Sequence, residues 1–463
     1  MARLARMILT VLLALSTATV LASEAPFEPL LLFMERDDAY APVGVLSFQA
    51  NPLEERAAIE LAEGVSAEGG QGRRAPRFHP LLAIPTGEGD SYVFGCTHHE
   101  DPGTEPRTFL WQLYRGRTPD GYRLTEWKEV FRNPEEIPWL IESALVHQQA
   151  TDELFFFTWS RHDQPEEGHA LWGFSSGDGL DWQPLADRPI YVDHDAFGSM
   201  WDPHTGRFLT AQVTYQPWEK LYPDNIGPYQ RRVLSIMTSR DGLEWERQVD
   251  AGPGGLITPD ADDTPDLEFY RMQPFRYGDR YVAMANLYTP SLIMPDVHGP
   301  HLGCEWWVSA DGVRWNRPWR DVDAHGNAPY PVKMAPMWFG REMLFWTSGV
   351  VMGLPEYRLA SIGARSNAEF SSRAIEMPDR PLLLNASVPI GRGLFNQAYV
   401  AVEIRDASGN VIPGYEYDKC ILQGVDDTRI PLSWEGRDGT ELAGQKVQFR
   451  FYLRSARIYA IGL

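Results

Sequence analysis

The sequence contains few cysteines, three in 463 residues. Three thiols allow at most one disulfide, with Cys96 and Cys304 the pair to test, so the fold cannot depend on a disulfide framework. Each cysteine is therefore expected to be a small, buried apolar residue. Long amphipathic helical patterns are also lacking, whereas 40 glycines and 36 prolines divide the chain into short segments. Together these features predict an all-β fold.

Basic residues are fewer than acidic ones. The chain has 42 Lys and Arg and 63 Asp and Glu, which gives a net charge of −21. This balance argues against a nucleic-acid partner. Beyond the N-terminus no apolar run is long enough to span a bilayer. Residues 1–22 combine Arg3 and Arg6 with an apolar run and a small residue, Ala22, as a cleaved signal peptide does; a retained anchor is the alternative. We expect a secreted or periplasmic protein with no membrane span after cleavage.

Patterns that hold metals, phosphates or serine nucleophiles are missing as well. The chain has no His-x-Glu-x-x-His and no paired-cysteine spacing, so we predict no metal site. It has no glycine-rich phosphate loop and no Gly-x-Ser-x-Gly turn, which removes the nucleotide-binding and serine-esterase hypotheses. No cofactor is expected.

What the chain does contain is a repeat, Ser-x-Asp-Gly-(Leu/Val)-x-Trp, at 176–182, 239–245 and 309–315. Looser versions stand at 118–127 and 365–370, which makes five units of similar length. Asp-Gly between apolar runs predicts a hairpin turn, because Gly tolerates positive φ and the carboxylate accepts backbone N–H bonds. The Ser can bond the same turn, and the Trp falls in the returning strand, where it can wedge between sheets.

Repeated small antiparallel sheets of this length predict a five-bladed β-propeller over 27–378. Two expected strands within Leu30–Gln49 are candidates to close the ring, and Glu54–Glu63 is predicted as a short helix. The fifth blade is assigned the runs Val332–Trp338, Met343–Trp346 and Tyr357–Ile362. The repeat stops after Pro378, and the strand pattern of 379–463 predicts a separate C-terminal β-sandwich, which binds sugar or caps the propeller.

In a propeller the first strand of each blade lines the central channel, so acids at the starts of successive blades meet at one mouth. Glu142, Asp195, Asp266 and Glu268 hold such positions. Glycoside hydrolysis needs a proton donor with a raised pKa and a second carboxylate as nucleophile or base. We assign Glu268 as the acid, Asp195 as nucleophile or base, and Glu142 or Asp266 as the modulator. Chance placement is the competing interpretation in a chain with 63 acids.

Several neighbours of these acids are candidate substrate-binding residues. Imidazoles and phenols bond sugar hydroxyls, and an arginine fixes a carboxylate or a hydroxyl. Asp202, in an Asp-Pro-x-Thr-Gly run, is interpreted as a β-turn residue instead. The binding candidates are His147, His194, Tyr270, Arg271 and His301.

With its repeats and acid-bearing blade starts, the stretch Pro29–Met377 resembles the five-bladed propellers of glycoside hydrolase families 32 and 43. That resemblance implies three carboxylates in a central funnel, a carbohydrate substrate and, for family 32, a C-terminal β-sandwich. The family 32 signature Trp-Met-Asn-Asp-Pro-Asn-Gly is absent, so the resemblance implies the fold rather than residue roles. A non-catalytic carbohydrate- or protein-binding propeller is the alternative, and a polysaccharide lyase using Tyr270, Arg271 and His301 is a third.

Overall fold

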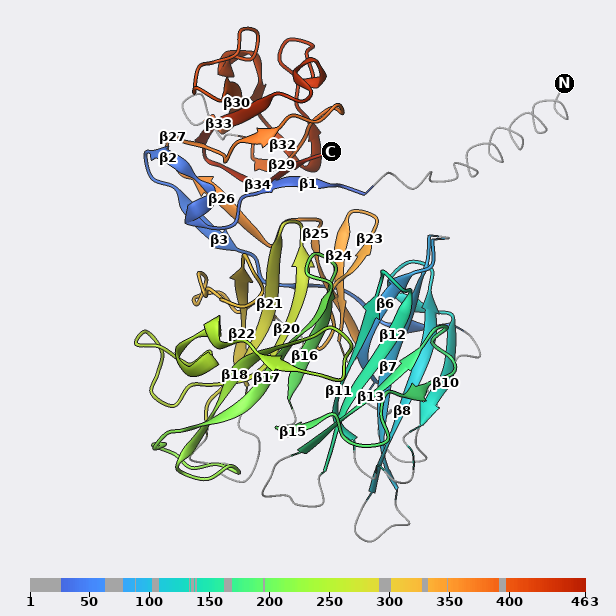
Figure 1. Ribbon diagram of the computed structural model, residues 1–463. Coiled ribbons are helices and arrows are strands. Elements are labelled where there is room, and N and C mark those ends of the chain that lie inside the picture. The colour runs from blue at the N-terminus through green and yellow to red at the C-terminus, as the bar shows by residue number, and fades with distance from the viewer. Residues whose placement is uncertain are drawn as a thin grey trace, which may run out of the picture.

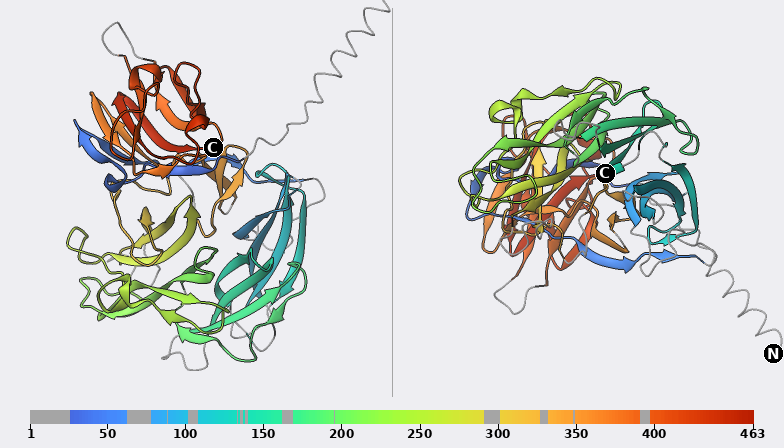
Figure 2. Two further views of the ribbon diagram at one scale, coloured as in Figure 1. Left: turned by 45° about the horizontal axis from the view of Figure 1, so that its top comes forward. Right: turned by 90° about the horizontal axis from the view of Figure 1, so that it is seen from below.

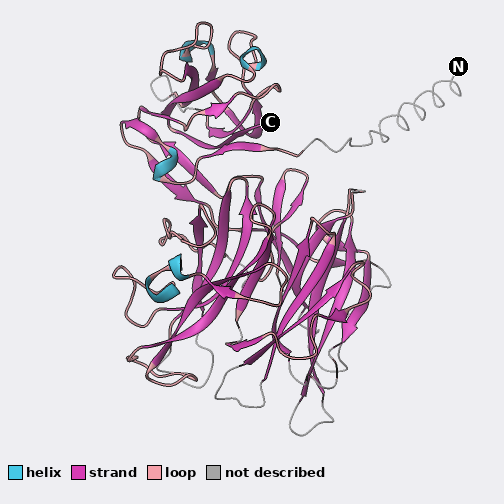
Figure 3. Ribbon diagram, in the orientation of Figure 1, coloured by secondary structure: helices cyan, strands magenta, loops and turns pink. Residues whose placement is uncertain are grey.

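The computed structural model describes residues 26–62, 78–87, 89–101, 108–132, 134, 137, 140–161, 169–194, 196–290, 301–326, 332–347, 349–390 and 397–463. These residues form strands and loops, and their helical parts are single 3₁₀ turns (Figure 3). The all-β prediction is confirmed. The 3₁₀ turns are η1 (Arg36–Asp38), η3 (Val249–Ala251), η4 (Pro253–Gly255), η5 (Tyr417–Lys419) and η6 (Thr440–Leu442).

Five separate sheets follow one another along the chain, and we call them the five-sheet body (Figure 1). The first sheet contains β6 (Phe78–Pro85), β7 (Ser91–Asp101), β8 (Thr108–Thr118) and β10 (Glu126–Arg132). The second contains β11 (Leu140–Gln148), β12 (Glu153–Arg161), β13 (His169–Ser176), β14 (Gln183–Pro184) and β15 (Tyr191–Asp193). The third contains β16 (Phe197–Asp202), β17 (Arg207–Pro217), β18 (Gln230–Ser239) and β19 (Glu246–Arg247). The fourth contains β20 (Glu268–Tyr277), β21 (Arg280–Tyr288) and β22 (His301–Ser309), and the fifth β23 (Met337–Phe339), β24 (Glu342–Trp346), β25 (Val350–Pro355) and β4 (Glu54–Ala58).

The repeated motif forms the hairpin turn that its sequence predicts. In all three full copies the Gly N–H donates to the Ser hydroxyl at 2.9 Å, as at Gly242. The Asp carboxylate accepts the next two backbone N–H groups at 2.8 to 3.0 Å. The looser copy at 118–121 makes the same bonds, with Thr118 in place of Ser. The copy at 365–370 differs, because it joins two strands outside the five sheets.

The turn glycines also pack each sheet onto the one before it. A Cβ added at Gly312 of the fourth sheet would lie 2.6 Å from Leu209 of the third, and one at Gly179 of the second 2.7 Å from Phe94 of the first. At Gly121 of the first sheet it would lie 2.7 Å from Leu344 of the fifth. The first and fifth sheets are therefore neighbours, although more than 200 residues separate these two positions.

Residues from β6, β11, β16, β20 and β23 line one cavity of about 340 Å³. These are the first strands of the five sheets. Two of them approach closely at Gly198, where an added Cβ would lie 2.2 Å from the backbone oxygen of Met272. The innermost strands of all five sheets thus face a common axis.

The remaining strands build two six-stranded sheets, the two-sheet body, which sits above the five-sheet body (Figures 1 and 2). One sheet contains β1 (Pro29–Leu32), β3 (Ser47–Ala50), β26 (Ala360–Ala364), β29 (Leu383–Val388), β32 (Val425–Pro431) and β34 (Ala456–Gly462). The other contains β2 (Tyr40–Val43), β27 (Ala368–Ser371), β28 (Ile375–Glu376), β30 (Tyr399–Asp406), β31 (Ile421–Leu422) and β33 (Lys446–Arg454). A core rich in buried Phe, Val, Leu and Ile, such as Phe370 and Phe451, fills the space between them.

Three predictions about the N-terminal part and the fifth sheet are wrong. The strands within Leu30–Gln49 pair with β26, β27 and β34 of the two-sheet body rather than with the last sheet of the five-sheet body. Glu54–Ala58 is the outer strand of the fifth sheet and not a helix, and Glu60–Leu61 is β5, which pairs in parallel with β9 (Arg123–Leu124). Ala360–Ala364 belongs to the two-sheet body.

The three cysteines are buried free thiols, as expected, and Cys96 and Cys304 are not bonded to each other. Among the described residues no helix is long and apolar enough to cross a membrane.

Candidate functional site

Glu142 and Arg271 meet where the first strands of the second and fourth sheets begin. Arg271 Nη1 lies 2.7 Å from Glu142 Oε1, and Lys333 Nζ, just before the fifth sheet, lies 2.8 Å from Glu142 Oε2. Burial alone would raise the pKa of Glu142, but the charges of Lys333 and Arg271 outweigh it and hold that pKa below its ordinary value. Glu142 is therefore an ionised carboxylate with a side chain 12% exposed.

Glu268 begins β20 and is part of a second, deeper charge cluster. Its Oε1 lies 2.5 Å from Lys220 Nζ and its Oε2 lies 2.8 Å from Arg232 Nη1. Asp224 bridges the same two cations, each at 2.8 Å. The Glu268 side chain is only 1% exposed and makes charge-assisted contacts with both cations. These contacts suit a carboxylate that positions other groups better than the proton donor suggested by the sequence.

Both glutamates stand at the end of the five-sheet body that lies away from the two-sheet body. β20 runs from Glu268 to Tyr277, and the Tyr277 ring lies 5.1 Å from Tyr357 in the link to the two-sheet body. Glu268 is consequently at the far end of that strand. Because Arg271 follows three residues later and pairs with Glu142, the two glutamates belong to the same region.

Asp193 and His194 lie just before the first strand of the third sheet. Burial raises the pKa of Asp193 to about 6, although Arg247 partly offsets this. Burial, with the charges of His169 and Arg232, lowers the pKa of His194 to about 4, so its imidazole is neutral near pH 7. The His194 ring stacks on Tyr215 with centroids 3.4 Å apart.

Asp193 is the residue that the sequence did not single out, because Asp195 holds the more obvious position two residues later. The signal in the sequence was the pair of acids flanking His194, and burial raises the pKa of Asp193. Asp193 remains 13% exposed and His194 22%, so both reach solvent. A carboxyl that is protonated near pH 6 and reaches solvent has the properties of a general acid.

The other predicted site residues are distributed as follows. The Asp266 side chain accepts the backbone N–H of Leu221 at 3.1 Å, which is a loop contact. Tyr270 lies beside the deep cluster, with its ring 5.4 Å from the Arg232 guanidinium carbon. Asp195 lies outside the described residues, and so does the side chain of His301, whose backbone begins β22.

His147 belongs to the opposite end of the axis. It lies five residues after Glu142 on β11, which separates the two by about 16 Å in an extended strand. Its Nε2 lies 2.8 Å from Asp152 Oδ1, and it lines the axial cavity near Trp201 and Trp338. The structure therefore does not bring His147 to the glutamates.

The second sheet carries an ionised Glu142 on β11, its innermost strand, and a protonatable Asp193 at the end of β15, which pairs with β13. Among the described residues no group of three His, Cys, Asp or Glu side chains is placed to hold a metal ion. Carboxyl groups such as Glu142 and Asp193 can take part in acid–base and nucleophilic chemistry.

Several solved glycoside hydrolase structures are similar to this chain. A glycosyl hydrolase from Bacteroides ovatus is 12% identical over 60% of this chain and 84% of its own, with a TM-score of 0.39. A family 117 glycoside hydrolase of the marine bacterium Zobellia galactanivorans is 10% identical over 68% and 91%, with a TM-score of 0.44. A β-fructofuranosidase from Schwanniomyces occidentalis is 9% identical over 89% and 98%, with a TM-score of 0.39. No model of a known protein family and no curated protein sequence matches the chain.

Proposed function

We propose that the five sheets form a closed five-bladed β-propeller and that the two-sheet body is a β-sandwich. The contact of Gly121 with Leu344 and the cavity shared by five first strands support closure. Of the predicted limits, 27–378 and 379–463, the strand pairing favours moving residues 29–50 and 360–378 to the sandwich. The basic and apolar pattern of residues 1–22 supports export to a secreted or periplasmic location.

The function that this geometry supports best is hydrolysis of a glycosidic bond. Asp193 is the proton donor, because its raised pKa keeps it protonated close to pH 6. Glu142 is the nucleophile or the base, because Lys333 and Arg271 keep it ionised. The coexistence of these two carboxyls with opposite pKa shifts, Glu142 on β11 and Asp193 at the end of β15, is the observation that carries the proposal.

Glu268 is then a positioning residue. Its ion pairs with Lys220 and Arg232 hold Arg232 beside Tyr270 and Tyr288, whose rings lie 5.4 and 5.0 Å from the guanidinium carbon. The assignment of Glu268 as the acid and of Asp195 as nucleophile or base remains the competing version. That version predicts a different pattern of activity losses when these residues are substituted.

A non-catalytic carbohydrate-binding propeller is the second candidate function. The observation in its favour is that both Glu142 and Glu268 are held by two cations each, which is also how buried charges are compensated in a purely structural cluster. Such a protein would bind glycans at this mouth and leave them intact.

The test is hydrolysis of aryl glycosides with graded leaving groups by the wild-type protein, Asp193→Asn and Glu268→Gln. A proton donor matters most when the leaving group is a poor one. We expect Asp193→Asn to lower kcat/KM by about 100-fold or more on a poor leaving group and by less than about tenfold on a dinitrophenyl glycoside. Glu268→Gln should lower both to a similar extent.

The opposite pattern, with leaving-group dependence in Glu268→Gln alone, would return the acid role to Glu268. Wild-type protein that cleaves none of the glycosides and none of a panel of natural glycans would refute hydrolysis and leave the binding function.

A further inference from the structure

Five lysine and arginine side chains are buried among the described residues, and all but one of them form an ion pair with a glutamate. The four paired cations are Lys220, Arg232, Arg271 and Arg450. The fifth is Arg231 on β18, which is 7% exposed and has no carboxylate within ion-pair distance in the described part of the chain. Buried charges are normally paired, because burial removes their hydration. A buried cation without such a partner is a group that an anionic ligand would satisfy.

The contacts of Arg231 hold its guanidinium group in one orientation. Nε donates to Gln216 Oε1 at 3.0 Å, and the guanidinium carbon lies 3.9 Å from the centroid of the Trp218 ring. Nη1 and Nη2 have no hydrogen-bond partner among the described residues and, unlike the buried Nε of Arg271, they are not closed off from solvent. These two nitrogens form the free edge of a planar fork, which matches two oxygens of a carboxylate or of a sulfate group.

The acids whose charges reach Arg231 are engaged by other cations. Burial lowers the pKa of Arg231, and the charges of Glu268 and Asp263 only partly offset this effect. Glu268 is held by its own two cations, and Asp263 Oδ1 accepts a bond from Arg317 Nη2 at 2.8 Å. A guanidinium group stays protonated in a protein. Arg231 is therefore a positive charge that the surrounding residues do not compensate.

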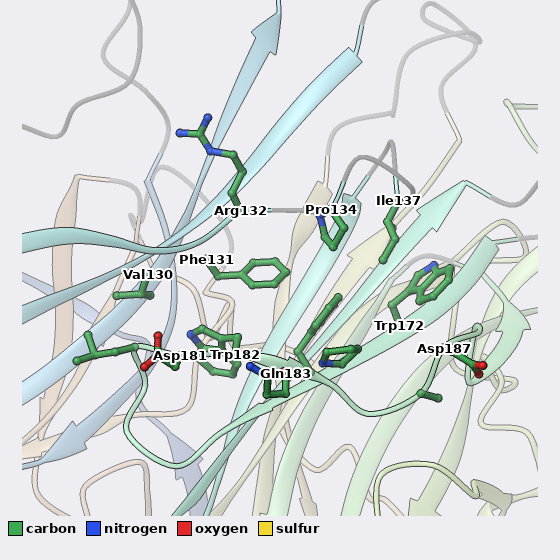
Figure 4. A pocket seen from close by; sticks show the side chains of 14 residues that line it. Val130, Phe131, Arg132, Pro134, Ile137, Trp172, Asp181, Trp182, Gln183 and Asp187 are labelled. Atoms are coloured by element: carbon green, nitrogen blue, oxygen red, sulfur yellow. The ribbon is translucent and has the colours of Figure 1, made fainter.

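The cavity between β10 and β13 provides a contrast, because its cation is already paired. Phe131, Trp172 and Arg132 are among the residues that line it (Figure 4). Arg132 donates to both carboxylate oxygens of Glu129, each at 3.0 Å. That cavity gives no indication of the charge of a ligand, whereas Arg231 indicates an anion.

Aromatic rings lie beside Arg231 on the same face of the third sheet. Arg231 is opposite Gln216 in the register of β17 and β18, and the Trp218 N–H extends the pairing by donating to the Tyr229 backbone oxygen at 2.9 Å. Opposed residues share a face, and every second residue of a strand returns to it. Trp218 and Tyr229 are 38% and 70% exposed, so their rings are available to pack against the apolar face of a sugar.

The same strand connects Arg231 to the proposed proton donor. The side chain of Thr214, two residues before Gln216 on β17, is hydrogen-bonded to Asp193. Two residues of an extended strand span about 7 Å, so Asp193 and Arg231 contact neighbouring positions on one sheet face. Arg232, the next residue of β18, bonds Glu268, which places Arg231 at the same end of the five-sheet body as the glutamates.

We propose that Arg231 selects an anionic saccharide, whose carboxylate or sulfate group binds Nη1 and Nη2 while an adjacent sugar ring packs on Trp218 or Tyr229. The inference rests on the proposed function and names its substrate class, a glycan that contains uronic acids or sulfate esters. The chain carries a net charge of −21, so its surface repels a dense polyanion. A glycan with isolated anionic groups along a neutral chain therefore suits this site best.

The test is calorimetric titration of the wild-type protein with matched pairs of oligosaccharides, using Glu142→Gln for any pair that the wild type cleaves. Oligosaccharides of galacturonic, glucuronic and mannuronic acid are each compared with their methyl esters, which lack only the charge. Sulfated galactan oligosaccharides are compared with unsulfated ones. We expect at least one anionic saccharide to bind about tenfold or more tightly than its neutral counterpart. The pair that shows the preference identifies the group as carboxylate or sulfate.

Two arginine variants locate the preference. Arg231→Gln should abolish the difference between the anionic saccharide and its neutral counterpart. Arg240→Gln is the matched control, because Arg240 is exposed in the turn at the other end of β18 and its loss changes the net charge equally. That variant should keep the full preference.

Equal affinity of the wild-type protein for the two members of every pair, or no binding at millimolar saccharide, would overturn the inference even if Arg231→Gln does not fold. An unchanged preference in folded Arg231→Gln would overturn it as well. The outcome is distinguishable from that of hydrolysis. Cleavage of neutral glycans alone would keep hydrolysis and remove the anionic substrate, whereas Arg231-dependent binding without any cleavage would keep the anion site and remove hydrolysis.

Discussion

Arg271 Nη1 lies 2.7 Å from Glu142 Oε1, a contact that joins the first strands of two different sheets across 129 residues of sequence. Lys333 brings a third sheet to the same carboxylate. Ion pairs therefore link separate sheets at this end of the axis. The proposed hydrolysis therefore relies on side chains that also hold these sheets together.

Substitution of Arg271 should destabilise the folded protein. Arg271→Leu leaves a largely buried Glu142 with one cation, and we expect the free energy of unfolding to fall by about 3 kcal/mol. Arg314→Leu is the control, because Arg314 pairs with Asp311 at 3.2 Å on the surface and is 72% exposed. That change should cost less than about 1 kcal/mol. Urea denaturation measures both, and equal costs would contradict a special role for the axial pair.

The close approach of β16 and β20 predicts that a substitution at Gly198 strongly destabilises the protein. Its added Cβ would lie 2.2 Å from the Met272 backbone oxygen, so Gly198→Ala must push two innermost strands apart. We expect a loss of about 3 kcal/mol or more, or failure to fold. Gly177→Ala is the control, since an added Cβ there meets nothing within 4 Å. The measurement is the thermal unfolding midpoint of each variant. Similar midpoints would argue against close packing of β16 and β20 at the axis.

The raised pKa of Asp193 makes stability depend on pH in a defined direction. Its pKa is about 6 in the folded protein and about 3.9 in the unfolded chain, so the folded state binds more protons between these values. The contribution of Asp193 is therefore most favourable below about pH 4 and is lost as pH rises to about 6. Asp193→Asn should gain about 2 kcal/mol relative to wild type over this interval.

His194 acts in the opposite direction, because its lowered pKa makes the unfolded state bind more protons between about pH 4 and 6.5. The difference between wild type and Asp193→Asn at each pH separates the two groups. Urea denaturation at pH 4, 5, 6 and 7 supplies it. A constant difference would show that Asp193 has an ordinary pKa.

The thiols should be inert in the native protein. All three are buried and free, and burial raises their pKa values, that of Cys420 to about 11. We expect no reaction with a thiol reagent under native conditions and three thiols titrated in denaturant without reductant. One thiol in denaturant would reveal a disulfide between the other two.

Local chemistry explains which parts of the fold the sequence predicts. The Asp-Gly hairpins are visible because the Ser, Asp and Gly bonds join residues at most three apart. The strand Glu54–Ala58 cannot be recognised in this way, because its charged composition favours a helix. It becomes a strand only by pairing with Val350 and its neighbours, some 300 residues later. The N-terminal strands are predicted, but their partners are not, because those partners lie at residue 360 and beyond.

The candidate site likewise has features that the sequence predicts and features that it does not. Position at the start of a blade strand placed Glu142 and Glu268 in one region, and this can be inferred from the repeats alone. Their ion-pair partners, Lys220, Arg232, Arg271 and Lys333, come from distant segments. The burial that raises the pKa of Asp193 has no signature in the sequence.

Hydrolysis of a glycan panel by wild type, Glu142→Gln and Glu356→Gln tests the central claim most directly. Glu356 is an equally paired, buried glutamate, bonded to Arg429 at 2.6 and 2.9 Å far from the axial mouth. We predict that the wild-type protein cleaves at least one glycan, that Glu142→Gln lowers kcat/KM by about 100-fold or more, and that Glu356→Gln retains wild-type kcat/KM while unfolding more readily. Full activity in folded Glu142→Gln would contradict the account.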